Sequence, residues 1–308
     1  MIKRVLCFEN PARLSLRLEQ IVVELTAVVN NPNVPEIAQK MGTKTIPIED
    51  VGVVVLDNRQ ITITHALIDA LLENNCAIIT CNEKHLPVGL MLPLDGHNLQ
   101  SERFREQINA SEPLKKQMWQ QTVVAKILGQ AHVLGMQHIE HNNMLKWAKD
   151  VRSGDTDNME ARAAAYYWRN VFGDQDFIRA QEGLPPNNLL NYGYSIVRAM
   201  MARALVAAGL LPTLGIHHHN RYNAYCLADD IMEPYRPFVD EKVLTMIKQG
   251  MVGEDITTAQ KIQLLGLCTA DVHIEGHRRP MMLTIQTTAQ SVQKCYSGEA
   301  RKIIYPDW

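Results

Sequence analysis

The sequence changes character near residue 97, and this change constrains the fold more than any other feature. Before it, Leu14 to Leu18 alternate with polar residues and Val51 to Leu56 form a short apolar run. Both patterns are typical of strands. After it, Ser101 to Met136 carry charges at helical spacing. The sequence therefore predicts an α+β fold, with an N-terminal β-rich domain at residues 1–97 and a larger all-α domain at residues 98–308.

The two regions are expected to hold different elements. In the first we expect a long loop at residues 30–42, a helix from His65 to Asn74, and strands at residues 14–18, 21–23, 45–48, 51–56, 61–64 and 76–81. In the second we expect helices at residues 101–136, 159–171, 189–208, 224–248 and 257–267. Pro113 marks a helix start there, since proline suits a first turn.

Composition excludes several classes of protein. With 46% hydrophobic residues and a formal net charge of −2, the 308-residue chain can bury a large core and is not disordered. Its N-terminal apolar run is too short for a signal peptide, and its longest uncharged apolar stretch is too short to cross a bilayer. Its six cysteines form no C-x-x-C pair. We therefore expect a cytoplasmic protein with reduced thiols and no contact with a membrane.

Familiar catalytic signatures are missing from the sequence. The P-loop, the G-x-G-x-x-G fingerprint, the G-x-S-x-G elbow and the H-E-x-x-H helix are all absent. The near-zero net charge gives no global sign of nucleic-acid binding, although a binding face can be local. Candidate catalytic or metal-binding residues lie in three other segments.

The first segment, residues 155–169, contains Glu160 near the start of a predicted helix. With Asp157 as N-cap, Glu160 would complete a variant of the capping box. The functional interpretation is a carboxylate metal ligand held rigidly on a helix. The sequence leaves both interpretations open.

The second segment, residues 214–223, contains three consecutive histidines. In an extended chain, His217 and His219 would point one way and His218 the other. A histidine in a loop can be a solvated or capping group, or it can bind a metal.

The third segment, residues 227–240, carries Asp229, Asp230 and Glu233. On one helix these carboxylates would crowd one side and repel each other unless a cation joined them. Two prolines, the first at Pro234, would kink or re-phase the helix there. The alternative is a solvated acidic helix start.

An oxygen-rich site with two carboxylates and one imidazole would favour Mg²⁺ or Mn²⁺ over structural zinc. Such a site suits phosphodiester chemistry. Two other groups look like metal clusters but have neither known spacing nor a regular setting, and we interpret them as loops: His138, Glu140 and His141, and His273, Glu275 and His277.

The same segments carry a resemblance to a known family. The strings at residues 160–164 (EARAA), 191–194 (NYGY), 215–218 (GIHH) and 227–234 (LADDIMEP), with FENP at 8–11 and ITHAL at 63–67, resemble CRISPR-associated protein one. This family is the integrase and endonuclease of CRISPR spacer acquisition, here in the form found in type II systems. The likeness covers residues 3–290.

The resemblance implies a fold and a site. It implies an N-terminal β-domain, expected to dimerise, and a helical catalytic domain with a metal site. By position the catalytic residues and ligands of Mg²⁺ or Mn²⁺ would be Glu160, His218 and Glu233, with Asp230 as a further acidic position. The triple histidine also allows His217 or His219 in place of His218.

The resemblance also implies an activity and partners. The family inserts short foreign DNA at CRISPR repeat boundaries through attack by the fragment's 3′-hydroxyl, and it cleaves double-stranded and branched DNA. A homodimer, bridged by a dimer of the small CRISPR-associated protein two, is expected. The type II effector nuclease and a DNA-end-binding ring protein are further expected partners. No tyrosine would attack DNA, so Tyr166, Tyr167, Tyr192 and Tyr194 should pack or contact DNA.

Two other classes of function stay open. The chain could be a DNA-end-binding scaffold without catalysis, or a metal hydrolase of small molecules. Residues 183–228 contain no Asp or Glu, which predicts a basic surface beside the acidic cluster and salt-sensitive DNA binding. Candidate phosphate contacts are Arg162, Arg169, Arg198, Arg203, Arg221 and Arg236.

Overall fold

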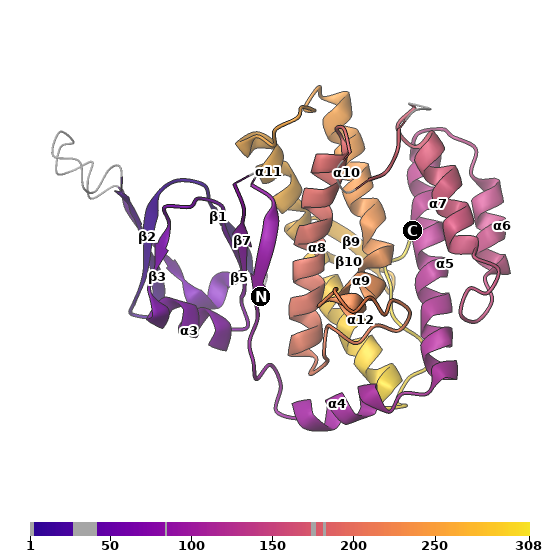
Figure 1. The fold of residues 1–308 in the computed structure, drawn as a ribbon, viewed down its shortest axis with the longest axis horizontal. Helices are drawn as coiled ribbons and strands as arrows, with labels where there is room; N and C mark the ends of the chain where they lie inside the picture. The colour runs from indigo at the N-terminus through magenta and orange to yellow at the C-terminus, as the bar shows by residue number, and fades with distance from the viewer. Residues whose placement is uncertain (1–2, 27–41, 84, 174–176, 181–182) are drawn as a thin grey trace. The chain divides into compact units, whose positions relative to one another are not determined.

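A computed structural model describes residues 3–26, 42–83, 85–173, 177–180 and 183–308 of the chain. Contacts divide the chain into two compact units, residues 1–95 and residues 96–308 (Figure 1). Most of the long loop expected at residues 30–42 lies outside the described residues. Within the described parts, the chain contains no helix with both the length and the hydrophobicity that crossing a membrane requires.

The first unit contains a four-stranded sheet in the order β1-β5-β7-β8. The strands β1 (Arg4–Phe8), β5 (Val51–Leu56) and β7 (Ala77–Cys81) run parallel, and β8 (Pro87–Met91) pairs with β7 in the antiparallel sense. Val53, Val54 and Val55 are all buried. Side chains of a strand alternate between faces, so β5 is covered on both. This explains why its sequence is continuously apolar.

A second four-stranded sheet has the order β4-β3-β2-β6. Its strands are β2 (Ala12–Arg17), β3 (Gln20–Leu25), β4 (Thr43–Pro47) and the short β6 (Thr62–Ile63). Leu14 opposes Val23 in the β2–β3 register. Both belong to a buried cluster that also takes in Val54 of β5, Ile78 of β7 and Leu67 of helix α3 (His65–Glu73). The core of this unit therefore joins both sheets and the helix.

The second unit is mainly helical. Its helices are α4 (Gln100–Ile108), α5 (Glu112–Met136), α6 (Asn142–Asp150), α7 (Met159–Asn170), α8 (Asn187–Ala207), α9 (Cys226–Met232), α10 (Arg236–Lys248), α11 (Thr258–Leu265) and α12 (Met281–Tyr296). Short 3₁₀ turns η1 (Ile48–Asp50), η2 (Glu233–Tyr235) and η3 (Gly266–Thr269) occur in the two units. Most of α8 is buried, as expected of a helix that packs against four others, α9, α10, α11 and α12 (Figure 1).

The predicted α+β class is confirmed, with strands first and helices after. The helical region expected over residues 101–136 consists of two helices, and the second begins where Pro113 predicted a helix start: Ser111 accepts a hydrogen bond from the Leu114 N–H and caps this helix, with Pro113 in its first turn. The helix expected over 224–248 is divided by η2, where Pro234 predicted a kink or a change of phase. The helices α6 and α12 were not predicted.

The second unit also contains a hairpin, so its strands depart from the all-α expectation. Strands β9 (Asp271–Ile274) and β10 (His277–Pro280) pair around Glu275 and Gly276, both of which have positive φ. Two such residues form the tight turn that two-residue hairpins prefer. His273 and His277 therefore belong to strands, not to the loop that we expected.

Gly193 provides a test of the packing around α8. A Cβ at this position would clash with Val239 Cγ1 of α10, whereas a Cβ on Gly266 would meet nothing within 4 Å. We expect Gly193→Ala to lower the free energy of unfolding by about 1–3 kcal/mol, because the core is overpacked. Gly266→Ala, the matched control, should be neutral or slightly stabilising. Urea unfolding measures both, and an equal effect of the two substitutions would contradict this packing.

Candidate functional site

The predicted acidic residues meet at one lysine. Lys126 Nζ, from the middle of α5, donates a hydrogen bond of 2.5 Å to Glu160 Oε1 and lies 2.6 Å from Glu233 Oε2. The lysine side chain is 11% exposed and that of Glu233 is 9% exposed, whereas Glu160 is more open at 27%. Three separate parts of the chain thus bring their charges to one point.

Lys126 is absent from the residues predicted above, although the sequence contains a signal for it. It stands inside the apolar run Val123 to Leu128 on a helix. Lysine is rarely buried unless it has a charged partner. Burial works against the charge of Lys126, but Glu233 and Glu160 outweigh it and raise the pKa of the ammonium. The ammonium is therefore held in its charged form.

Glu160 is positioned by a cap that differs from the predicted one. Asp155 Oδ1 accepts from the Met159 N–H at 2.8 Å, and Asp155 Oδ2 accepts from the Glu160 N–H at 3.0 Å. The expected cap, Asp157, instead lies 3.4 Å from Arg152. Because Asp155 satisfies the free N–H groups of the first turn, the Glu160 carboxylate is not used for capping and points to Lys126.

Glu233 is positioned where the helix is interrupted, at the point where Pro234 predicted a kink or a change of phase. It begins the 3₁₀ turn η2 between α9 and α10. Its Oε1 accepts from Arg236 Nε at 2.8 Å, while its Oε2 faces Lys126. Burial opposes the charge of this carboxylate, but Arg236 and Lys126 prevail and lower its pKa to about 2. Glu233 is therefore ionised under all ordinary conditions.

His218 is fixed by Asp230, a fully buried aspartate of α9. Asp230 Oδ2 accepts from the His217 N–H at 2.9 Å and from the His218 N–H at 3.3 Å, and Asp230 Oδ1 bonds His218 Nδ1. This last bond does most to raise the pKa of the His218 imidazole, and Glu233 and Glu160 add to it. With Nδ1 on Asp230, Nε2 remains the nitrogen that can bind a metal.

The close approach at this loop also requires a glycine. A Cβ on Gly215 would clash with the His218 carbonyl oxygen and would come within 2.8 Å of Asp230 Oδ2. The LGIHH sequence therefore has a geometric reason for its glycine: a larger residue would push the histidines away from Asp230.

His217 has a different environment from its neighbour. Its ring stacks on Trp119 of α5, with centroids 4.1 Å apart and planes inclined by 1°. Burial lowers the pKa of His217. His219 is exposed at the surface of the loop. Of the three histidines, His218 is the one whose ring hydrogen-bonds a buried carboxylate.

Crowding on one helix suggested that Asp229, Asp230 and Glu233 share a cation, but Asp229 does not join the other two. Arg198 donates to both of its oxygens, at 2.6 and 2.9 Å, and Asn223 Nδ2 donates to Oδ2 at 2.6 Å. The three neighbouring carboxylates each have their own partner. Asp229 therefore fixes the far end of the histidine loop to α8.

The donors at this site fit a hard divalent cation. Two carboxylates face one point, and a neighbouring imidazole is oriented by its hydrogen bond to Asp230; this donor set suits Mg²⁺ or Mn²⁺. Their spacing is wider than in a closed metal cluster. Among the described residues, the one group of three potential ligands with all ligand atoms within 4.8 Å of one another is Cys7, Glu9 and Asp57 in the first unit.

That second group lies where β1 and β5 end. His85 Nδ1 is 3.0 Å from Asp57 Oδ1 beside it. The sequence did not predict it, and it shares no residue with the site around Lys126. The two groups predicted to be plain loops contribute no ligands to either cluster: His141 Nδ1, for example, hydrogen-bonds the Ile139 carbonyl at 2.9 Å.

Three of the four tyrosines predicted to pack or contact DNA have hydroxyl groups that are hydrogen-bonded within the fold. The Tyr167 hydroxyl donates to Asp240 Oδ2 at 2.9 Å, and the Tyr194 hydroxyl donates to Asp240 Oδ1. Arg236 lies over the Tyr194 ring, 4.5 Å from its centroid. Tyr167, Tyr194 and Asp240 thus form a buried layer, and this layer contacts the arginine that hydrogen-bonds Glu233. Tyr166 hydroxyl bonds the Glu140 carbonyl at 2.7 Å.

The candidate phosphate contacts divide into two groups. Arg198, Arg203 and Arg236 are buried or paired with the acids of the site. Arg162, Arg169 and Arg221 are exposed. Arg221 lies over the ring of Tyr222, which is 81% exposed, in the loop that follows the histidines.

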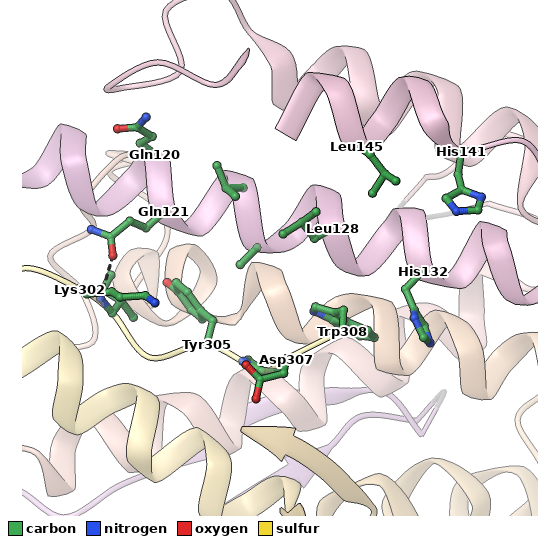
Figure 2. Close-up of a pocket in the computed structure, with 14 residues that line it drawn as sticks. Gln120, Gln121, Leu128, His132, His141, Leu145, Lys302, Tyr305, Asp307 and Trp308 are labelled. Carbon is green, nitrogen blue, oxygen red and sulfur yellow. Dashed lines mark hydrogen bonds between the residues drawn. The ribbon is translucent and has the colours of Figure 1, made fainter. Parts of the chain in front are cut away.

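A separate cleft lies between α5 and the C-terminal segment (Figure 2). Figure 2 shows Tyr305, Asp307 and Trp308 on one side, with Gln121 and Leu128 of α5 on the other. None of the predicted site residues lines it.

Comparisons with known proteins agree on one family. The family model described as CRISPR associated protein Cas1 matches residues 7–266. The chain is 35% identical over 295 residues to the CRISPR-associated endonuclease Cas1 of Neisseria meningitidis serogroup C, covering 95% of this chain and 92% of that protein. Its fold resembles a casposase bound to integration product, with a TM-score of 0.77, 17% identity, and coverage of 97% and 92%. It also resembles part of a Cas6-RT-Cas1–Cas2 complex, with a TM-score of 0.72, 17% identity, and coverage of 98% and 36%.

The buried layer behind Glu233 predicts a pH effect on stability. Burial raises the pKa of Asp240 to about 6, from an ordinary value of 3.8, although both tyrosines oppose this shift. An acid whose pKa is raised by folding binds more protons when folded. Its stabilising contribution is therefore greatest below pH 3.8 and is lost as the pH rises to about 6.

We expect wild type to lose up to about 3 kcal/mol of stability relative to Asp240→Asn over this window. Urea unfolding midpoints at several pH values from 4 to 7 measure the difference. Parallel pH profiles for the two proteins would contradict the shifted pKa.

Proposed function

This chain belongs to the CRISPR-associated Cas1 family, and we propose that it is a metal-dependent DNA integrase and endonuclease of spacer acquisition. In this proposal it inserts short foreign DNA at CRISPR repeat boundaries by transesterification, and it also cleaves DNA. The observation that carries the proposal is the meeting of Glu160 and Glu233 at Lys126, beside a His218 ring oriented by Asp230.

Glu160, Glu233 and His218 would hold Mg²⁺ or Mn²⁺. Bound there, the ion would polarise the phosphate and stabilise the charge that develops during in-line displacement. Asp230 bonds His218 Nδ1, which leaves Nε2 as the ring nitrogen that would bind the ion. Arg236 holds one oxygen of Glu233 and leaves the other directed into the site.

The reaction exchanges one phosphodiester bond for another. The 3′-hydroxyl oxygen of the incoming fragment attacks the phosphorus at the repeat boundary and loses its proton. The bond from phosphorus to the 3′-oxygen of the nucleotide that precedes this phosphate breaks, and that oxygen leaves with a proton. Because the number of phosphodiester bonds is conserved, no nucleotide cofactor is needed. No protein nucleophile takes part, in keeping with Tyr167 and Tyr194 being committed to Asp240.

The loop at residues 217–222 supplies a surface for DNA beside the site. All six residues are exposed, none is acidic, and Arg221 and Tyr222 stand at its end. A cation can contact phosphate and an exposed ring can stack on a base. The acid-free sequence from 183 to 228 thus supports local, salt-sensitive binding despite the net charge of −2.

The proposed partners follow the family. They are double-stranded and branched DNA, a second copy of the chain, and the small CRISPR-associated protein two, with the type II effector nuclease and a DNA-end-binding ring protein as further partners. The casposase and Cas1–Cas2 structures named above support DNA and the small protein as partners. The setting would be the cytoplasm. A DNA-binding scaffold without catalysis is less well supported, because it gives no reason for a buried aspartate, Asp230, to orient the His218 ring beside two carboxylates.

Substitutions at the three histidines test the site assignment. We expect His218→Ala to reduce strand transfer into a supercoiled plasmid by about 100-fold or more, because the imidazole that Asp230 orients is lost. His219→Ala, an exposed neighbour, is the matched control and should retain most activity. His217→Ala should have an intermediate effect through the lost contact with Trp119.

The same assay separates the classes of function. Glu160→Gln and Glu233→Gln should also abolish strand transfer, and EDTA should abolish it in wild type. A Glu160→Gln protein as active as wild type would contradict the catalytic role of Glu160, whereas a wild type that binds DNA without any strand transfer would support the scaffold. If His217→Ala lost strand transfer while His218→Ala stayed active, the metal ligand would be His217 and not His218.

A further inference from the structure

The position of the Lys126 ammonium conflicts with that of a metal ion. Its Nζ is 2.5 Å from Glu160 Oε1 and 2.6 Å from Glu233 Oε2. Oxygen ligands bind Mg²⁺ and related ions at about 2.0–2.6 Å. An ion that joined these two oxygens would therefore overlap the ammonium, and both cannot occupy this point together.

The lysine is also anchored so that only its end can move. Its neighbours on α5, Val123 and Ile127, are fully buried, and the helix is packed against α6, α7 and α10. The flexible four-carbon stem allows the ammonium to change position while the helix stays in place. Movement toward the open side is possible because Glu160 is the more exposed of its two partners.

Glu233 keeps a counter-charge if the ammonium moves away. Arg236 Nε remains 2.8 Å from its other oxygen, Oε1. Glu160 has no comparable second cation among the ion pairs of the described residues. Lys126 is thus the contact that draws the Glu160 carboxylate to Glu233.

We propose that Lys126 is a positioning residue that competes with the divalent ion. Its ammonium holds Glu160 and Glu233 together as a preformed pair of ligands, and it leaves their shared oxygens when the ion binds. The inference rests on the proposed metal site and adds to it a residue that sets the affinity of that site. Removing the ammonium removes a competitor, so metal binding becomes tighter even though the free protein becomes less stable.

The test measures Mn²⁺ binding to the full chain without DNA, by isothermal titration calorimetry. The variants are Lys126→Met and Lys126→Gln, which remove the charge, and Lys126→Arg, which keeps a cation. We expect the dissociation constant for Mn²⁺ to fall by about tenfold or more in the two neutral variants, since ion binding no longer has to break the charge-assisted hydrogen bond to Glu160 and the ion pair with Glu233. The arginine control should stay close to wild type or bind more weakly.

The rise in melting temperature on adding Mn²⁺ gives a second readout, one that a purely structural role of Lys126 would not change. Without metal, the neutral variants should melt below wild type, because two carboxylates lose their shared partner. Saturating Mn²⁺ should raise their melting temperature by more than it raises that of wild type. Equal or weaker Mn²⁺ binding in both neutral variants would overturn the competition. If one neutral variant fails to fold, the other and the arginine control decide.

Glu233→Gln separates this inference from the proposed function. If wild type binds Mn²⁺ and Glu233→Gln does not, the metal site is confirmed. The Mn²⁺ dissociation constants of the lysine variants then decide whether Lys126 competes with the ion. If wild type shows no binding that depends on Glu233, the metal site itself fails and the competition fails with it.

Discussion

The contact of one buried ammonium with two carboxylates is the constraint on which the second unit depends. Lys126 of α5 joins the first turn of α7 to the turn η2 through Glu160 and Glu233. Removing one partner of a buried charge pair typically costs about 3–5 kcal/mol, because the other charge is left without compensation. The helices around Lys126 must therefore keep their relative positions, and that geometry is what supplies two carboxylates to one point.

The acids of the site avoid repulsion by having separate partners. Asp229 has Arg198, Asp230 has the histidine loop, and Glu233 has Arg236 as well as Lys126. The small net charge of the chain is consistent with this local pairing and says little about whether DNA can bind. What matters is that the paired acids lie beneath an exposed loop without acidic residues.

The sequence allowed the fold class and the main helices to be predicted, because long periodic patterns are strong signals. It did not reveal the hairpin β9–β10, whose polar residues resemble a loop until Glu275-Gly276 is recognised as a tight turn. In the site, Glu160, His218 and Glu233 came from a family resemblance. Asp157 was the wrong cap because Asp155, three residues before the helix N-cap, accepts the hydrogen bonds from the N–H groups of the first turn. The place of Lys126 in the site depends on its tertiary contacts with Glu160 and Glu233, which sequence periodicity does not reveal.

The most direct test of this account is a crystal structure of the full chain with Mn²⁺, with the ion located by its anomalous scattering. We expect one ion bound by Glu160, Glu233 and His218 Nε2, with His218 Nδ1 still on Asp230 and Lys126 Nζ displaced from between the carboxylates. An ion found only at Cys7, Glu9 and Asp57, or one bound at the glutamates with Lys126 unmoved, would contradict it.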